Sequence, residues 1–408
     1  MATPTLNDEK TLQRGRPIKN RLIKSAMSEQ LGNARHDPDE RLARLYRAWA
    51  DGGIGLSMTG NVMIDRNALG EPKNVVLDEQ SDLDAFRNWA EQGQANATQV
   101  WMQLNHPGKQ IPKFLNSQPV APSAVPLGGG LEKMFATPRA LEGDEIQAII
   151  GQFARSAHLA KETGFSGVQI HGAHGYLVSQ FLSPRHNQRD DEWGGSPENR
   201  RRFVLAVHEA IREVVGPDFP VGIKLNSADF MKDGFSEEES MDVVRALTEA
   251  GIDLIEISGG TYEAPAMTGF KAKKENAREA YFLDYADAVR RHTDVPLMVT
   301  GGFRSATAMQ QALDSGATDF IGLARPMAVD PELPRTLLSN PQAKLAIKRP
   351  STGFKGLDKA LMLDITYYES QLARHADGKK PKPGLSPWIT VANTFAAMGA
   401  NAFKPRRG

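Results

Sequence analysis

Hydrophobic residues in this chain gather in short runs that alternate with longer amphipathic segments. Eight of the runs are four to eight residues long, and their Val, Ile and Leu content is typical of strands buried on both faces. The pattern predicts strands at residues 21–27, 54–60, 97–104, 167–170, 221–225, 252–257, 295–300 and 319–323.

The segments between the runs have the periodicity of helices. Leu42, Leu45, Tyr46 and Trp49 lie at i, i+3, i+4 and i+7, and two glycines at 52–53 end that helix. Similar apolar faces are formed by Ile146, Ile149, Ile150, Phe153 and Ala157, by Phe203, Val207 and Ile211, and by Tyr281, Tyr285 and Val289. Ser236 and Glu239 form a capping box. Other N-caps are expected at Ser81 or Asp82, at Ser196 and at Ser305.

Eight strand–helix units of this kind predict an α/β fold, a closed (β/α)₈ TIM barrel. The alternative is a doubly wound open sheet. The even spacing of the units and the lack of a Gly-x-Gly-x-x-Gly sequence after the first strand argue against it.

Three segments do not fit the repeat. Residues 1–20 are expected to form a turn or hairpin that covers the bottom of the barrel. Residues 106–143 are rich in Pro and Gly, and a loop of this length in a compact domain is often a lid or a binding wall. We expect one domain over residues 1–408, with a barrel at about 17–342 and a helical extension at about 343–408.

Composition narrows the function. There are 49 basic and 49 acidic residues, so net charge gives no reason to expect nucleic acid or an acidic membrane as a partner. The chain has no cysteine, which excludes thiolate metal sites, iron–sulfur clusters and a Cys nucleophile. No apolar signal core or membrane span is visible, so a cytoplasmic protein is expected, and it could form a homo-oligomer.

Barrel enzymes carry their sites at the carboxyl ends of the strands, and glycines there suggest a phosphate site. The pairs Gly259–Gly260 and Gly301–Gly302 follow the sixth and seventh strands, and Arg325 follows the eighth. Glycine lets backbone N–H groups approach an anion closely, and an arginine guanidinium can bind the same anion through two parallel N–H groups. The alternative interpretation is ordinary turn glycine.

His171, His174 and Tyr176 follow the fourth strand and allow three interpretations. They could ligate a metal with Asp229, although carboxylates at the other strand ends are few. They could be structural. They could also bind a substrate oxygen, with the phenol as proton donor to a carbanion beside a carbonyl. Lys224 ends the fifth strand, where a fixed cation could stabilise negative charge on a ligand.

From about Pro17 to Pro334 the chain resembles the Old Yellow Enzyme family of NAD(P)H:flavin oxidoreductases and ene-reductases. The motifs that carry the resemblance are KNRLIKSAMSE, GIGLSMTGN, QLNHPGKQ, HGAHGYLVSQFLSPRHNQRDDEWGGSPENRRRF, VGIKLNSADF, TGG and GLARP. The fourth motif is long and specific, so the resemblance favours the substrate interpretation of the histidines over a metal or a structural role.

The resemblance implies non-covalent FMN at the mouth of the barrel. By motif, the segment Ser25, Ala26, Met27 and Ser28 and the residue Gly60 would line the isoalloxazine ring. The pyrimidine side would be held by Gln103 and Lys224, and the phosphate by Gly301, Gly302, Ala324 and Arg325. The small-molecule substrate would be an activated alkene, bound through its carbonyl by His171 and His174 and protonated by Tyr176. The implied mechanism is ping-pong hydride transfer, with NADH or NADPH as reductant.

Three positions depart from the family pattern: Lys224 stands where many relatives have Arg, Ser28 where they have Cys or Thr, and Gln30 where one branch has an aromatic residue. These differences affect substrate range and redox potential. An FMN-dependent demethylase or dehydrogenase on the same barrel, or a non-catalytic FMN- or phosphate-binding barrel, are the alternatives. The second flavin domain and iron–sulfur cluster of the dienoyl-CoA reductases are not expected here.

Overall fold

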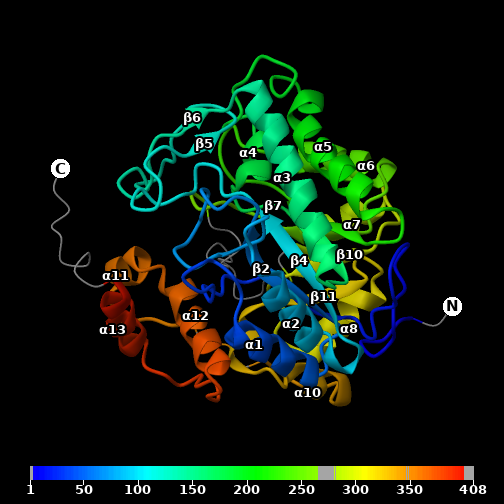
Figure 1. Ribbon diagram of the computed structural model, residues 1–408. Coiled ribbons are helices and arrows are strands. Elements are labelled where there is room, and N and C mark those ends of the chain that lie inside the picture. Colours follow the sequence, from blue (N-terminus) through cyan, green and yellow to red (C-terminus); the bar gives the residue numbers. More distant parts are fainter. Residues whose placement is uncertain (1–2, 265–279, 281, 346, 348, 399–408) are drawn as a thin grey trace.

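The computed structural model describes residues 3–264, 280, 282–345, 347 and 349–398 (Figure 1). Eight parallel strands close into a barrel in the order β1-β11-β10-β9-β8-β7-β4-β2, and a β1–β2 pairing completes the ring. These strands are β1 (Leu22–Lys24), β2 (Leu56–Met63), β4 (Gln99–Asn105), β7 (Gly167–Gly172), β8 (Val221–Asn226), β9 (Leu254–Ser258), β10 (Leu297–Thr300) and β11 (Phe320–Leu323). The predicted (β/α)₈ barrel is confirmed.

Helices surround the barrel and connect its strands (Figure 1). They are α1 (Glu40–Asp51), α2 (Leu83–Gly93), α3 (Gly143–Glu162), α4 (Leu177–Leu182), α5 (Pro197–Val215), α6 (Glu237–Glu249), α7 (Leu283–Arg290), α8 (Ala306–Asp314), α9 (Arg325–Val329) and α10 (Leu333–Ser339). The capping box of Ser236 and Glu239 is present, and the caps at Asp82, Ser196 and Ser305 accept hydrogen bonds as predicted. Tyr281 of the predicted face lies outside the described residues.

Several strand limits differ from the sequence prediction. Residues 97–104 were expected to be extended, but a 3₁₀ turn, η1 (Ala95–Ala97), occupies the start, and β4 begins at Gln99. The chain leaves the sheet after Lys24, whereas β2 and β7 run further than predicted. Gly60 lies within β2, as in the predicted strand, whereas His171, which was expected to follow its strand, lies within β7.

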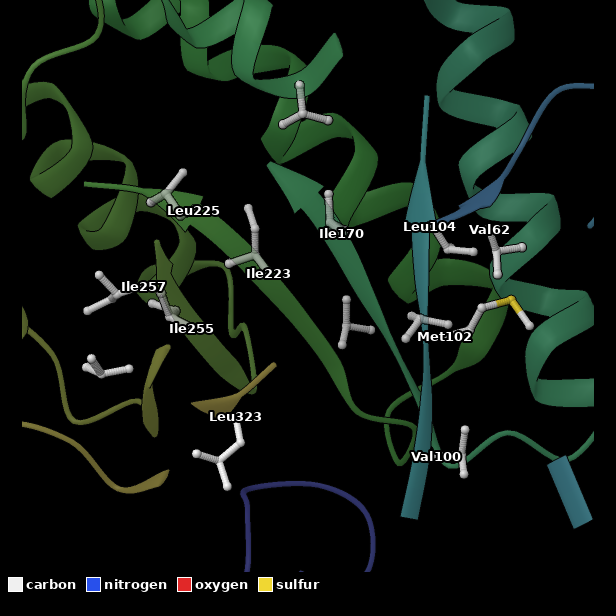
Figure 2. Packing of buried hydrophobic residues seen from close by; sticks show 14 of the residues in the cluster. Val62, Val100, Met102, Leu104, Ile170, Ile223, Leu225, Ile255, Ile257 and Leu323 are labelled. Atoms are coloured by element: carbon white, nitrogen blue, oxygen red, sulfur yellow. The ribbon is translucent and has the colours of Figure 1, made fainter. Parts of the chain in front are cut away.

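Side chains on β4 alternate between the outer and the inner face of the barrel wall. Val100, Met102 and Leu104 on β4 pack in the large cluster between the strands and the helices, which Figure 2 shows from close by. Trp101, between them, belongs to a second cluster inside the barrel. That inner cluster also contains Leu12 and Ile18 from the N-terminal segment. Lys10 and Ile18 pair across a hairpin there, so the predicted cover at the bottom of the barrel is confirmed.

Short strands lie outside the barrel. β3 (Val75–Val76) extends the sheet beside the end of β2. β5 (Val120–Ala121) and β6 (Arg139–Ala140) form a separate parallel pair within the long loop at residues 106–143. Three further helices, α11 (Lys355–Ala360), α12 (Leu363–Ala376) and α13 (Pro387–Met398), follow the barrel (Figure 1). Of these, α12 packs on α1 and α9. Within the described residues, no helix combines the length and apolarity that a membrane crossing requires.

Candidate active site

A belt of polar side chains crosses the inside of the barrel near the carboxyl ends of its strands. Lys224 Nζ on β8 lies 3.1 Å from Glu256 Oε1 on β9. The same Glu256 oxygen accepts a hydrogen bond of 2.7 Å from Thr300 Oγ1, which lies 2.8 Å from Ser25 Oγ. Because Lys224 and Glu256 are both buried, solvent screens their charges little.

Two amides extend the belt to β4. Gln103 Nε2 donates to Gln169 Oε1 at 2.7 Å, and Gln169 Nε2 donates to Glu256 Oε2 at 2.8 Å. Gln103 Oε1 is buried and has no hydrogen-bond partner among the described residues. Since a buried unpaired acceptor costs free energy, this oxygen marks a place for a ligand that carries a donor.

The backbone after β10 has open space beside Gly301. Gly301 and Gly302 have φ angles of +104° and +89°, in the region where side chains are disfavoured. A Cβ built on Gly301 would meet no other described atom within 4 Å, so an anion could approach the backbone there. Ala324 is the N-cap residue of α9, and Arg325 at its start forms no ion pair within the described residues.

The glycine pair after β9 is different. A Cβ on Gly259 would lie 2.8 Å from ring carbons of Phe230 and Phe282, so the chain itself fills the space beside this residue. Gly260 N–H donates to Ala228 O at 3.0 Å. The expectation that both glycine pairs face a phosphate is therefore wrong for the first pair, which serves internal packing.

The segment after β1 runs beside the belt. Ser25 is fully buried, Ala26, Met27 and Ser28 are half-buried, and Met27 O would lie 2.6 Å from a Cβ on Gly60. Glycine at position 60 is thus needed for the close approach of this segment to β2. Ala26 packs against the inner cluster, and Ser28 Oγ donates to Glu71 Oε2 at 2.6 Å.

His171, His174 and Tyr176 come together at the end of β7. The ring centroids of His171 and His174 are 5.2 Å apart, and those of His171 and Tyr176 are 4.8 Å apart, both edge to face. His174 has a φ of +62°, and Asn226 Oδ1 on β8 accepts its N–H at 3.2 Å. Its Nε2 lies 2.8 Å from Ser258 Oγ on β9, so neighbouring strands fix this ring.

Burial sets the protonation of these groups. It lowers the pKa of His171 well below 6.5, with His174 and Lys224 adding to the effect. Burial, followed by the charge of Lys224, does the same to the pKa of His174. Both imidazoles are therefore neutral at pH 7. Burial also raises the pKa of Tyr176 above its usual value of 10, so the phenol stays protonated.

A second tyrosine lies in the site, and sequence reasoning missed it. Tyr262 Oη, on the loop after β9, is 2.8 Å from Tyr176 Oη, and Asn61 Nδ2 lies 3.5 Å from the same Tyr176 atom. The motif GGTYE holds only one aromatic residue, with no pattern around it that would have indicated this contact.

Two carboxyl groups also escaped prediction. Gln30 Nε2 donates to Glu369 Oε2 at 3.0 Å, so α12 reaches the segment after β1. Burial and the nearby Glu71 raise the pKa of Glu369 to about 8, and burial raises the pKa of Glu71 as well. No periodicity links residue 369 to residue 30, so only the fold could reveal this contact.

The metal interpretation finds no support in the described part of the chain, which contains no group of three or more potential metal-binding His, Asp or Glu residues. Asp229, the residue considered for that role, accepts hydrogen bonds from Ser183 Oγ at 2.7 Å and from Phe235 N at 3.1 Å. These contacts give it a structural role.

Comparison with known proteins agrees with this geometry. Residues 13–343 match the NADH:flavin oxidoreductase / NADH oxidase family. The NADH-dependent flavin oxidoreductase iliE of Hypocrea jecorina (strain QM6a) is 40% identical over 361 residues, which is 82% of this chain and 89% of that protein. The iliE protein of Neonectria sp. (strain DH2) is 41% identical over 358 residues, and the match spans 81% of this chain but only 47% of that relative.

Solved structures show the same fold. The Old Yellow Enzyme homologue from Zymomonas mobilis has 26% identity and a TM-score of 0.70, over 84% of this chain and 94% of that one. Morphinone reductase has 26% identity and a TM-score of 0.71, and the match covers 85% of this chain and 92% of that one. The chain belongs to the NADH:flavin oxidoreductase / NADH oxidase family, as an oxidoreductase of the Old Yellow Enzyme type with FMN as cofactor and NAD(P)H as reductant.

Proposed function

We propose that this protein reduces the activated C=C bond of α,β-unsaturated carbonyl compounds in two half-reactions that share one site. The observation that carries the proposal is the convergence of two neutral imidazoles and a protonated phenol at the end of β7, next to the buried Lys224. This set suits a substrate whose carbonyl is polarised and whose α-carbon then needs a proton.

The residues around the belt fit FMN. The unpaired Gln103 Oε1 could accept a hydrogen bond from the pyrimidine edge, and Lys224 supplies a cation for negative charge there. Gly301, Gly302 and Arg325 would hold the phosphate, the first two through backbone N–H groups and the third through its guanidinium. Ser25 to Ser28 and Gly60 would line the ring. The chemistry that bound FMN supplies is hydride transfer, from NAD(P)H in one half-reaction and to the β-carbon of the alkene in the other.

His171 and His174 would bind the carbonyl oxygen. His171 Nδ1 accepts the N–H of Ala173 at 3.3 Å, which places the proton of this neutral ring on Nε2, ready to donate. Ser258 Oγ can donate to His174 Nε2 and thereby leave the His174 proton on Nδ1 for the substrate. Two such donors withdraw electron density from the alkene and make its β-carbon electrophilic.

Tyr176 would deliver the proton to the α-carbon. A phenol is a weak acid, and burial weakens it further, so it protonates a carbanion but does not readily protonate the nitronate formed from a nitroalkene. Protonation is therefore expected to matter more for enones than for nitroalkenes.

Stopped-flow measurements on the FMN-loaded protein test the proposal. The flavin is reduced with NADH or NADPH under argon and mixed with 2-cyclohexenone, a maleimide or a nitroalkene. We expect rapid reoxidation and a saturated product. If only oxygen reoxidises the flavin and none of the alkenes is consumed, ene-reduction is wrong and NADH oxidase activity remains.

A further inference from the structure

We propose that Tyr262 works with Tyr176 as a hydrogen-bonded phenol pair, in which Tyr262 donates to Tyr176 Oη, directs the Tyr176 proton at the substrate and stabilises the phenolate that remains. This inference rests on the proposed function, because it assumes that Tyr176 is the proton donor. It adds a residue that the family motifs did not indicate.

The geometry favours this direction of donation. Tyr176 Oη lies 2.8 Å from Tyr262 Oη and 3.5 Å from Asn61 Nδ2, and an amide nitrogen can only donate. A phenol oxygen that accepts from both neighbours has its own hydrogen left for a third partner. If Tyr176 donated to Tyr262 instead, its proton would point away from the substrate.

Electrostatics separate the two phenols. Burial raises the pKa of both, but the hydrogen bond between them lowers the pKa of Tyr176 and raises that of Tyr262. Glu71 and Glu369 raise both values further. Tyr176 is thus the phenol of the pair that loses its proton more readily, and Tyr262 keeps its proton and serves as the donor.

The backbone around Tyr262 fixes its position. Thr261 forms a parallel bridge with His174, which ties the loop after β9 to the loop that carries Tyr176. On the other side, Glu263 Oε1 accepts the N–H of Gly128 at 2.8 Å, and His186 Nε2 lies 3.4 Å from Glu263 Oε2. The long loop at 106–143 therefore helps to hold the segment that carries Tyr262 in place.

Water is the final source of the proton that Tyr176 gives to the substrate. Hydride addition to the β-carbon leaves an electron pair at the α-carbon, which takes the proton of Tyr176. The negative charge on Tyr176 Oη is then stabilised by Tyr262 and Asn61. Tyr176 then takes one proton from water while Tyr262 keeps its own, so both phenols are restored and hydroxide is left to the solvent.

Tyr262→Phe tests the pair, with Tyr285→Phe as matched control. Tyr285 is also a buried phenol, and its hydroxyl donates to Ser240 Oγ at 2.7 Å, away from the proposed site. In Tyr262→Phe we expect FMN content and reduction by NAD(P)H to be unchanged, and oxidation by an enone to slow about 10- to 100-fold, the range for loss of a hydrogen bond to a charged group. The nitroalkene reaction should change little, and Tyr285→Phe should behave as the wild type.

A double-mutant comparison separates a chemical role from packing. In a Tyr176→Phe background, Tyr262→Phe should cause no further slowing, because the oxygen it acts on is already gone. Equal slowing in both backgrounds would mean that Tyr262 only fills space, and wild-type enone kinetics in Tyr262→Phe would also overturn the proposal.

The NMR signal of Tyr176 reports the hydrogen bond to Tyr262 without any turnover, so it tests the phenol pair separately from ene-reduction. In protein with ¹³Cζ-labelled tyrosine, Tyr262→Phe should shift the Tyr176 resonance, which is assigned by its loss in Tyr176→Phe. An unchanged resonance overturns the hydrogen bond whatever the activity is. A shifted resonance in a protein that reduces no enone supports the pair and counts against the proposed substrate class instead.

Discussion

Lys224 Nζ and Glu256 Oε1 lie 3.1 Å apart inside the barrel, in an ion pair whose side chains are 4% and 0% exposed. Sequence reasoning gave Lys224 the role of an isolated cation. In the structure, the positive charge of Lys224 is largely balanced by the carboxylate of Glu256 on β9. A ligand in the site would therefore meet a directed dipole, and the net charge near it is small.

Lys224→Met should lower the midpoint potential of the bound flavin, because the reduced ring gathers negative charge and the variant leaves the Glu256 carboxylate uncompensated. A shift on the order of 30 mV corresponds to about 1.4 kcal/mol for a two-electron couple. Reduction by NAD(P)H should slow as a result. Redox titration checks this, with Lys232→Met, an exposed lysine after β8, as control. An unchanged potential would remove Lys224 from the cofactor site.

Arg325→Ala should weaken FMN retention. The variant would remove the proposed charge-assisted hydrogen bond from the guanidinium to the phosphate. Such a bond is worth about 1.5–3 kcal/mol, so Kd should rise roughly 10- to 100-fold. Recovery of flavin fluorescence on dilution measures this constant. Arg245→Ala, in an exposed pair with Asp242 on α6, is the control and should bind FMN like the wild type. Equal retention by both variants would place the phosphate elsewhere.

Replacing His171 and His174 together with Ala should abolish binding of a para-substituted phenol, seen as loss of its long-wavelength charge-transfer band with the flavin. The two donors that would hold the phenolate oxygen are then absent. Enone turnover should fall strongly, while reduction by NAD(P)H should survive better because it needs no carbonyl contact. A band of wild-type intensity would show that other groups bind the oxygen.

Stability should depend on pH through Glu369. Its pKa rises from 4.5 to about 8 on folding, first because of burial and then because of Glu71. The stability it contributes is therefore fully present below about pH 4.5 and is lost as the pH rises through about 8. Glu369→Gln keeps an acceptor for Gln30 and removes the titration. Its Tm should be close to that of the wild type at about pH 4.5 and exceed it at pH 9, with a smaller excess between these values.

The control for that comparison is Glu213→Gln, at an exposed position on α5, whose Tm should follow the wild type at both pH values. If the difference in Tm between the wild type and Glu369→Gln does not change with pH, the carboxyl group of residue 369 does not titrate in this range.

The barrel could be predicted because its strands are rich in apolar residues and its helices carry a clear periodicity and caps. Val100, Met102 and Leu104 alone define one buried face of β4. The same regularity explains why the strand-end residues Gln103, His171 and Lys224 could be picked out: a barrel brings the carboxyl ends of all its strands to one face.

The partners of those residues could not be predicted, because contacts between loops leave no local pattern. Tyr262 meets Tyr176 across 86 positions of sequence, and Glu369 meets Gln30 across 339. Lys24 shows the same limit within a strand. In the sequence, Lys24 is one residue of a mainly apolar run. In the structure its Nζ is buried outside the barrel, where it donates to Met58 O at 2.7 Å and to Glu29 Oε1 at 3.1 Å.

The amide chain that runs from Glu256 to Gln103 has only one possible polarity. A carboxylate accepts and cannot donate, so Gln169 must turn its NH₂ toward Glu256, and Gln103 must in turn point its NH₂ at Gln169. The carboxylate of Glu256 on β9 therefore determines that Gln103 on β4 leaves its side-chain oxygen, and not its NH₂ group, free for a ligand. Glu256→Gln, a change of a single atom type, would release both amides to flip, and the edge of β4 could then offer a donor where it now offers an acceptor.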